Sequence, residues 1–405
     1  MTKLANYILK FQGSDYSYYF NLLNGKLVRY KGEIECTKNH RLLKYLKYNG
    51  YICDSEINYK KILNCTNKIA ITINVTNRCN FNCFYCYNKR DNFIEHEIDY
   101  NSIISFIKHL LSYNKECNEI FINYIGGEPL LNIDLILRIN EEITYICNDK
   151  DINYTHIITS NGFYLNELNI NRLIFNDLKN IQITLDGNID RHDRIRKTIY
   201  GEKSFNKILK NMYLAINKMN ITVRVNIGES TDISDIENLL YKLRDINVKD
   251  VYFACIENTF SYCGKEAIID REKMIQKYDD LWKLKFSLGF EFKQYLPPIL
   301  GLCPAKNKYA YNIDTDGSLY KCQCESSRTD LSIFNLNEKN KLISDSSINE
   351  VRKVLESCES CTYFIICLGG CKYLGRNNKK NIYCNKILYD SLIKKYICYK
   401  YGINL

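Results

Sequence analysis

The sequence has little proline and only moderate glycine, with 4 and 18 of these residues in a chain of 405. Long flexible linkers and collagen-like segments are therefore excluded. No apolar run approaches the roughly 18 residues that a membrane-spanning helix requires, so we expect no membrane partner. The N-terminal segment MTKLANYILKFQG also lacks an apolar stretch followed by a small-residue cleavage site, which favours a cytoplasmic protein.

Charge and hydropathy are those of an ordinary globular protein. Hydrophobic residues make up 46% and charged residues 25%, which excludes a disordered chain or a coiled-coil rod. Lysine and arginine number 56 against 46 aspartates and glutamates, a net charge of +10. The basic residues are dispersed and form no concentrated tract, so we expect no nucleic-acid partner. The length favours two or three domains.

Cysteine is the residue in excess, with 19 in the chain. A small secreted domain could use so many as disulfides, but this chain is large enough to bury its own core and holds an odd number of thiols. Metal or redox chemistry in a reducing compartment is the favoured interpretation.

Short β-rich runs alternate with amphipathic stretches of helical length from residue 69 onward. The runs cover residues 69–76, 119–127, 155–162, 180–187, 221–228 and 251–257. Repeated strand-helix units predict a parallel sheet with right-handed crossovers, either a doubly wound sheet or a partial β/α barrel. Polar, glycine-rich or cysteine-rich sequence follows one strand after another, and a barrel would bring these strand ends to one mouth. We therefore expect an α/β fold with a partial (β/α)6 barrel.

The two ends of the chain differ from this middle part. Residues 7–13 and 18–30 alternate like a hairpin with a turn at Asn24-Gly25, and a helix follows that ends at Asn49-Gly50. After about residue 290 the alternation stops and a cysteine-dense region begins. We expect three domains: a small β/α module at 1–66, a core at 67–290 and a cysteine-rich domain at 291–405.

The first cysteine group is Cys79, Cys83 and Cys86, spaced CxxxCxxC. Three thiolates can hold three corners of a cubane iron-sulfur cluster and leave the fourth iron open to another ligand. Zinc sites usually close with a fourth protein ligand. The motif alone leaves a zinc or structural site as an alternative.

This cysteine motif directly after a first strand, with Gly126-Gly127-Glu128-Pro129 after the second, resembles the radical S-adenosylmethionine (radical SAM) superfamily. The resemblance covers residues 69 to about 260. It implies that the three cysteines bind a [4Fe-4S] cluster whose open iron takes the amino and carboxylate groups of SAM. Reductive cleavage of SAM then yields a 5'-deoxyadenosyl radical that abstracts a hydrogen atom from the substrate.

The same resemblance implies which residues contact SAM. Tyr85 is expected against the adenine, and Arg196 is expected to pair with the carboxylate, with a surface helix charge as its alternative. The other implied contacts are Gly126, Gly127 and Glu128 at the ammonium, Ser160 and Asn161 near the ribose, and Thr184. His192 is interpreted as a structural neighbour. No residue is assigned as a catalytic acid or base.

The second cysteine group resembles the SPASM extension of radical SAM enzymes. Its spacing is Cys303-x13-Gly317-x4-Cys322, then Cys358-x2-Cys361-x5-Cys367-x3-Cys371, then Cys384. By this resemblance Cys358, Cys361, Cys367 and Cys384 bind auxiliary cluster II, and Cys303, Cys322 and Cys371 bind auxiliary cluster I. Some relatives supply a fourth ligand to cluster I from a position that is Pro297 here, so that iron is open unless Cys324 or Cys263 closes it.

SPASM proteins of this kind mostly modify peptides or proteins. Anaerobic sulfatase-maturating enzymes, which make formylglycine, carry an Asp immediately after the Gly-x4-Cys cysteine, and Gln323 stands there in this chain. A neutral amide cannot accept a proton, which disfavours that branch. Residues 1–66 resemble the leader-recognition modules of maturases, which capture a peptide as an added strand.

We therefore expect an oxidative peptide maturase that acts on a ribosomally made precursor peptide, forming a thioether between a cysteine sulfur and a carbon. Its expected cofactors are SAM and three [4Fe-4S] clusters, one of which binds SAM and two of which are auxiliary. A flavodoxin or ferredoxin is the expected reductant. Formylglycine formation and carbon-carbon crosslinking stay open as other reactions. A multi-cluster electron carrier is the alternative without catalysis.

Overall fold

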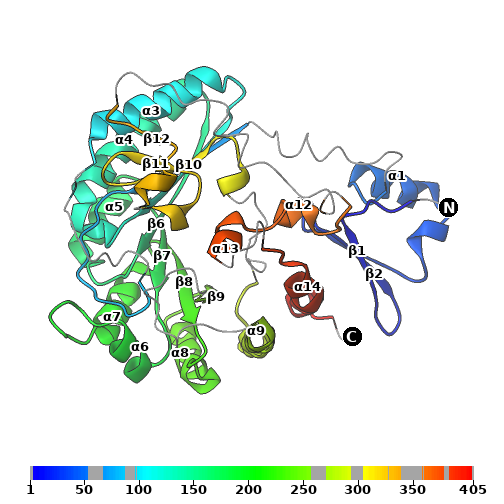
Figure 1. Ribbon diagram of the computed structural model, residues 1–405. Coiled ribbons are helices and arrows are strands. Elements are labelled where there is room, and N and C mark those ends of the chain that lie inside the picture. Colours follow the sequence, from blue (N-terminus) through cyan, green and yellow to red (C-terminus); the bar gives the residue numbers. More distant parts are fainter. Residues whose placement is uncertain are drawn as a thin grey trace. The chain divides into compact units, whose positions relative to one another are not determined.

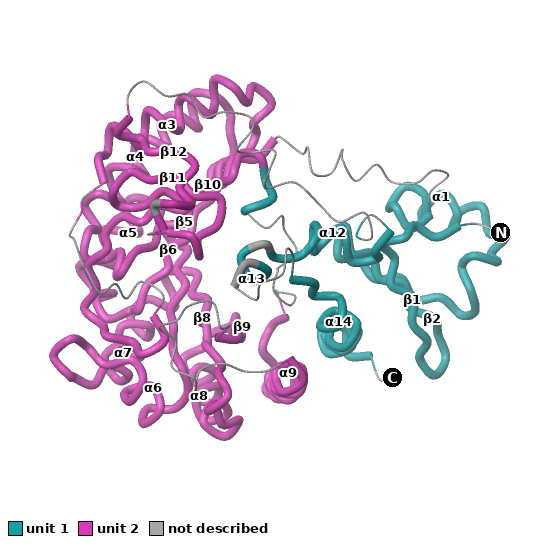
Figure 2. Tube along the Cα trace, in the orientation of Figure 1, with its two compact units in different colours: residues 1–65, 294–307, 352–405 teal, residues 66–293, 308–351 magenta. Residues whose placement is uncertain are grey.

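The computed structural model describes residues 3–52, 67–86, 96, 98–256, 271–292, 304–326, 328–338, 358, 360–377 and 383–403. The chain forms two compact units, coloured separately in Figure 2. The sheet unit comprises residues 66–293 and 308–351, and the terminal unit comprises residues 1–65, 294–307 and 352–405. The terminal unit thus combines segments from both ends of the chain, and the expected domain boundaries stay a prediction.

Six parallel strands form the centre of the sheet unit and follow one another in chain order. They are β4 (Lys68–Asn74), β5 (Glu119–Ile125), β6 (Asn153–Ser160), β7 (Asn180–Thr184), β8 (Asn220–Ile227) and β9 (Asp250–Cys255). Each matches one of the runs read from the sequence. The predicted α/β fold with a parallel sheet is confirmed.

Helices connect these strands and lie outside the sheet, as Figure 1 shows. They are α3 (Tyr100–Tyr113), α4 (Ile133–Asp149), α5 (Glu167–Phe175), α6 (Ile189–Ile195), α7 (Phe205–Ala215) and α8 (Ile233–Asp245). Asp99, Asn166, Asn188 and Asp232 precede α3, α5, α6 and α8, and each accepts a hydrogen bond from a backbone N–H of the first turn. Such caps satisfy donors that have no partner within the helix. The helix α9 (Arg271–Ser287) packs against α8 and β9.

The strands bury alternate side chains, as period-2 geometry requires. In β4, Ile69, Ile71 and Ile73 are buried, while Ala70 and Thr72 between them are only half-buried. One face of the sheet is therefore packed into the apolar core. Residues of the other parity point to the opposite face, where polar side chains gather near the strand ends.

Three further strands extend the sheet beyond β4: β10 (Ala310–Ile313), β11 (Ser318–Tyr320) and β12 (Phe334–Asn335). The sequence DTDGSLY forms the turn into a strand that it predicts, with Gly317 at a φ of +82°. The parallel pairing of β10 with β4 was not predicted. It brings the short 3-10 helix η5 (Gln323–Glu325), which follows β11, to the ends of the parallel strands.

The terminal unit contains the antiparallel strands β1 (Ile8–Gln12), β2 (Ser17–Asn21) and β3 (Leu27–Tyr30). Its helices are α1 (His40–Tyr48), α12 (Phe364–Cys367), α13 (Lys372–Asn377) and α14 (Lys386–Tyr401). Short 3-10 segments lie at Ile34–Cys36, Pro129–Asn132, Pro304–Lys306 and Thr329–Leu331 in the two units. The last turn of α14 packs on the β2–β3 hairpin, since the Tyr401 ring lies 6.4 Å from the Phe20 ring and its hydroxyl donates to the Gly25 carbonyl at 2.9 Å.

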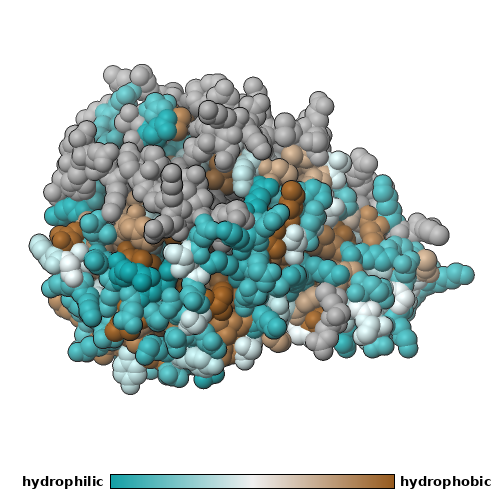
Figure 3. All heavy atoms as spheres, turned by 60° about the horizontal axis from the view of Figure 1, so that its bottom comes forward, coloured by the Kyte–Doolittle hydropathy of each residue, from teal (hydrophilic) through white to brown (hydrophobic). Residues whose placement is uncertain are grey.

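The described surface is mixed in polarity. On the face drawn in Figure 3, apolar side chains lie interspersed among hydrophilic ones. Of the described helices, none is both long enough and apolar enough to cross a bilayer.

Candidate functional site

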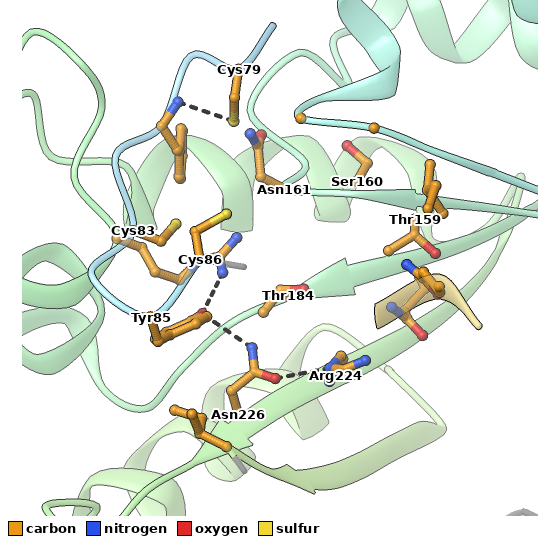
Figure 4. A pocket seen from close by; sticks show the side chains of 18 of the residues that line it. Cys79, Cys83, Tyr85, Cys86, Thr159, Ser160, Asn161, Thr184, Arg224 and Asn226 are labelled. Carbon is orange, nitrogen blue, oxygen red and sulfur yellow. Dashed lines mark hydrogen bonds between the residues drawn. The ribbon is translucent and has the colours of Figure 1, made fainter. Parts of the chain in front are cut away.

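A pocket of about 370 Å³ opens at the carboxyl ends of the parallel strands. It is lined by Cys79, Cys83 and Cys86 and by every predicted SAM contact except Glu128 (Figure 4). These residues lie at the ends of four different strands, β4 to β7, or in the segments that follow them. The structure therefore brings together groups that are spread over more than a hundred positions of sequence, as expected for strand ends that converge on one mouth.

The loop that carries the cysteines lies directly on the backbone of the two glycines. Gly127 donates to the Thr76 carbonyl at 2.9 Å, and Glu128 donates to the Arg78 carbonyl at 2.8 Å. A Cβ on Gly126 would lie 2.3 Å from the Thr76 oxygen, and one on Gly127 would lie 2.2 Å from the Arg78 oxygen. The glycines thus allow the cysteine loop to approach the end of β5. Their contact with the SAM ammonium stays a prediction.

The three thiols share one electrostatic environment. Burial, with smaller contributions from nearby Glu128, Cys83 and Cys86, raises the pKa of Cys79 to about 12, although an N–H bond from Phe81 opposes the rise. Such thiols need a positive partner to ionise, and iron would supply it.

The arrangement of the thiols also bears on which metal fits. Among the described residues, no three His, Cys, Asp or Glu side chains converge tightly enough to hold a single metal ion. A cubane cluster presents a different iron to each thiolate, whereas zinc needs its ligands to meet at one point. The three thiols line one pocket, which suits the three-thiolate ligand set of a cubane cluster with one open iron.

Glu128 lies behind the pocket wall and is fully buried. Its Oε1 accepts from the Leu130 amide at 3.0 Å and from the Ser160 hydroxyl at 2.7 Å, and its Oε2 accepts from the Asn161 amide at 2.7 Å. Burial raises the pKa of Glu128, while these hydrogen bonds oppose the rise. The side chain ties the ends of β5 and β6 together, and its contact with SAM stays a prediction.

Tyr85 is the centre of a buried polar network. Its hydroxyl donates to Asp186 and accepts from Arg196 Nη1 at 2.5 Å and from Asn226 Nδ2 at 3.0 Å. Arg196 Nη1 also lies 3.5 Å from the Asp186 carboxylate. Burial alone would lower the pKa of Arg196, but Cys83, Tyr85 and Asp186 raise it well above its ordinary value. The alternative of Arg196 as a surface charge is wrong, because the residue is only 7% exposed.

His192 acts as a support for this network. Its Nδ1 accepts from the Asp186 amide at 3.3 Å, and its Nε2 lies 3.1 Å from the Ser204 hydroxyl. Burial, with Arg196 nearby, lowers its pKa well below the ordinary value, so the ring is neutral. The interpretation as a structural neighbour agrees with this geometry.

Sequence reasoning missed several residues of the site. Asp186 stands in the DG that follows the fourth strand, and Asn226 and Arg224 are the polar positions of the run ITVRVNIG. Polar residues at alternate positions near the end of a parallel strand were the available signal. Gln323 and Cys324, which the resemblance had singled out by their positions, also line the pocket, and their place in it depends on the pairing of β10 with β4.

The cysteines predicted for auxiliary cluster II all belong to the terminal unit. Burial raises the pKa of Cys367, and Cys384, Cys358 and Cys361 add to the rise, so the four thiols lie near one another. The Gly370 amide donates to Cys367 Sγ at 3.1 Å, as amides do to cluster sulfurs. The ligand set of auxiliary cluster II stays a prediction.

The ligand set of auxiliary cluster I stays a prediction. Cys322 lies in the sheet unit and Cys371 in the terminal unit, while Cys303 and Cys263 fall outside the described residues. A hydrogen bond with Cys324, together with burial, raises the pKa of Cys322 well above its ordinary value. Cys324 is thus close enough to Cys322 to share a metal site.

Comparison with known proteins gives a family model and several relatives. Residues 73–243 match the model of the radical SAM superfamily. An uncharacterized protein of Methanocaldococcus jannaschii is 28% identical over 282 residues, which cover 67% of this chain and 90% of that protein. A cysteine-type anaerobic sulfatase-maturating enzyme of Clostridium novyi is 26% identical over 347 residues, covering 76% of this chain and 87% of that enzyme.

Two solved structures share the fold. Native anSMEcpe with bound AdoMet and Kp18Cys peptide has a TM-score of 0.63 at 18% identity, over 83% of this chain and 97% of that one. Streptococcus suis SuiB bound to the precursor peptide SuiA has a TM-score of 0.55 at 15% identity, over 95% of this chain and 98% of that one.

Proposed function

Because residues 73–243 form a radical SAM domain and the chain is a radical SAM enzyme, we propose that it modifies a ribosomally made precursor peptide in the cytoplasm. The proposed reaction joins a cysteine sulfur to a carbon of another residue as a thioether. Forming this bond removes two hydrogens from the peptide: the 5'-deoxyadenosyl radical would take the hydrogen atom on carbon, the thiol would release its proton, and an auxiliary cluster would accept the remaining electron.

Cys79, Cys83 and Cys86 are the residues that would hold the reactive [4Fe-4S] cluster, and the predicted SAM contacts in the lining, from Tyr85 to Arg196, would hold SAM. When bound, the cluster supplies the electron that cleaves SAM and so starts hydrogen abstraction. The chain's own part is positioning. Tyr85 is held from three sides by Asp186, Arg196 and Asn226, which fixes one wall of the pocket.

Apolar side chains cover other parts of the pocket wall and would exclude water from a reactive intermediate. They are Phe81, Ile125 and Ile256. Among the described lining residues there is no Asp, Glu, His or Lys. The described wall therefore offers no ordinary proton acceptor to the substrate.

The choice of reaction rests on the position of Gln323. It lines the pocket at the position where formylglycine-forming relatives are expected to carry an aspartate. An amide can orient a peptide but cannot take a proton from it. A crosslink suits this wall because the substrate thiol would lose its proton on binding the iron proposed to be open in auxiliary cluster I, so no lining residue would need to accept it. The structures of anSMEcpe and SuiB with bound peptides support a peptide as the substrate.

We further propose two auxiliary clusters. Cys358, Cys361, Cys367 and Cys384 would hold cluster II, and Cys303, Cys322 and Cys371 would hold cluster I. Three complete [4Fe-4S] clusters give about twelve irons per chain, whereas the reactive cluster alone gives about four. An iron assay on the anaerobically reconstituted protein separates the two counts.

The β1–β2–β3 sheet is the proposed site for the leader part of the peptide. β3 is an edge strand, and among the described residues no other strand pairs with its free side. An edge of this kind can take an extended peptide as an added strand. A flavodoxin or ferredoxin is the proposed electron donor.

Mass spectrometry of a candidate precursor peptide tests the proposal. Incubation with the reconstituted enzyme, SAM and reductant should remove two hydrogens per link and protect one cysteine from alkylation. A carbon-carbon crosslink would give the same mass loss but leave every cysteine alkylatable. SAM cleavage with an unchanged peptide mass would contradict crosslinking of either kind. The triple change of Cys79, Cys83 and Cys86 to Ala is the control and should abolish 5'-deoxyadenosine formation.

Formylglycine formation is the second candidate, favoured by the 26% identity to the Clostridium novyi sulfatase-maturating enzyme. A cysteine-containing sulfatase peptide would then lose its sulfur and gain an aldehyde that reacts with a hydrazide probe. That result, without a crosslink in any precursor peptide, would replace the thioether proposal.

A further inference from the structure

Arg224 lies within strand β8, whereas the predicted SAM contacts lie at strand ends or in loops. It pairs in register with Thr184 of β7 and with Tyr252 of β9. Asn226 follows two residues later on the same face of β8, nearer the carboxyl end of the strand. Figure 4 shows the two side chains next to each other, with Asn226 directed to Tyr85. Arg224 therefore belongs to the floor of the pocket.

The neighbours of Arg224 are neutral. Its Nε donates to Asn226 Oδ1 at 2.9 Å, and its guanidinium carbon lies 5.9 Å from the centre of the Tyr252 ring. The Tyr252 hydroxyl donates to Gln182 Oε1. The Gln182 amide thus turns its NH2 group away from Tyr252. Arg224 and Gln182 both line the pocket, and both can offer N–H donors to a ligand.

The guanidinium of Arg224 forms no ion pair with a described carboxylate. Two arginines line the pocket, and no Asp or Glu is among the described lining residues. Arg196 lies 3.5 Å from Asp186, whereas in the described part of the chain no acidic side chain forms an ion pair with Arg224. Burial alone would lower the pKa of Arg224, but Tyr252, together with Tyr85 and Asp186, raises it, so the guanidinium stays charged.

We propose that Arg224, with Gln182 beside it, binds a carboxylate of the peptide substrate and so selects which peptides are modified. This inference rests on the proposed peptide-modifying function. A guanidinium recognises a carboxylate through two parallel N–H bonds, and such charge-assisted bonds are stronger than neutral ones. The carboxylate can come from an Asp or Glu side chain near the reacting residue or from the C-terminus of the peptide.

Synthetic cysteine-containing peptides are the probe. One set of peptides carries Asp or Glu at each position around the cysteine, and the second set carries Asn or Gln at the same positions. Each peptide is made once with a free C-terminus and once with an amidated one. Binding to the SAM-loaded, reconstituted holoenzyme is measured by fluorescence anisotropy. We expect one carboxylate position to tighten binding by about ten- to a hundredfold over its amide counterpart. The position that matters identifies the source of the carboxylate.

Variants then assign the preference to Arg224. Arg224→Gln should bind both peptide sets equally and weakly, and Arg224→Lys should keep part of the preference because it keeps the charge. Arg244→Gln is the matched control, since Arg244 is exposed on α8. Iron content and SAM affinity should stay within about twofold of wild type in all three variants, which shows that each has folded.

Two results would overturn the inference. One is that the wild-type enzyme binds carboxylate and carboxamide peptides equally well. Binding of neither peptide counts as this same result. The other is a loss of SAM affinity in Arg224→Gln as large as its loss of peptide affinity, which would place Arg224 in the cofactor site. Failure of the crosslinking proposal is distinguishable, because it shows as an unchanged peptide mass while the carboxylate preference remains.

Discussion

Replacement of Gly127 by Ala should remove the reactive cluster while leaving the rest of the fold in place. The added Cβ would lie 2.2 Å from the Arg78 oxygen, 2.6 Å from the Arg78 carbonyl carbon and 2.8 Å from the Asn77 oxygen. All three atoms are backbone, so no side-chain rotation can relieve the contact. The loop that carries Cys79 has to move.

The cost follows from the contacts that this movement breaks. Overpacking costs about 1–3 kcal/mol. The Gly127–Thr76 and Glu128–Arg78 backbone bonds contribute about 0.5–1.5 kcal/mol each. Alanine has less conformational freedom than glycine in the unfolded chain, and this difference stabilises the folded variant by about 0.4–1 kcal/mol. We therefore expect the free energy of unfolding to fall by about 1–6 kcal/mol, with the loss concentrated in the cysteine loop.

Three measurements check this prediction on the reconstituted full-length protein. Iron should fall by about four of about twelve atoms per chain, SAM binding should be lost, and hydrogen exchange should rise at the amides of residues 75–80. Gly289→Ala is the control, because Gly289 has a φ of +77° but no atom within 4 Å of its added Cβ. That control should cost only the strain of the left-handed conformation, about 1–2 kcal/mol, and keep its iron.

Retention of full iron, normal SAM binding and a free energy of unfolding within about 1 kcal/mol of wild type in Gly127→Ala would refute the reasoning. The cysteine loop would then be free to move away without cost. The glycine would in that case serve the cofactor alone.

Three further predictions concern the buried groups of the site. Tyr85→Phe removes the hydroxyl shared by Asp186 and Arg196, so urea denaturation should show a loss of about 1–3 kcal/mol, and an unchanged midpoint would contradict the network. Glu128→Gln leaves an NH2 group facing amide and hydroxyl donors, and we expect a similar loss, with faster hydrogen exchange at the ends of β5 and β6 as the direct observation. His192 is neutral when folded and binds a proton below about pH 6.5 when unfolded, so stability should fall as pH drops through that value, by up to about 1.4 kcal/mol per pH unit. The slope should flatten in His192→Asn, and an equal slope in both proteins would show that another group titrates.

The strands of the sheet were predictable because their signal is local. Each parallel strand is a short β-rich run followed by polar or glycine-rich sequence, and all six were found within a few residues of their ends. The 3-10 helix at Gln323 was not predicted as an element, and only the resemblance marked Gln323 itself as a residue of the site. Its position depends on β10 pairing with β4, which lies more than two hundred residues earlier in the chain.

The polar network around Tyr85 was also predictable only in part. The resemblance pointed to Tyr85 and Arg196 by their motifs, but Asp186 and Asn226 join them only through the alignment of β7 and β8. Sequence reasoning assigned the two glycines to a ligand. The structure adds the backbone of the cysteine loop as a second reason for them.

The sequence by itself determined the α/β class, the order of the strands and the grouping of Cys79, Cys83 and Cys86 in one loop after the first strand of the parallel sheet. These features depend on spacing within single strands and loops, where neighbours in sequence are neighbours in space. Only the tertiary structure decided which charges are balanced. Arg196 meets Asp186, while Arg224 meets no described acid, because ion pairs form between strands whose register no local pattern records.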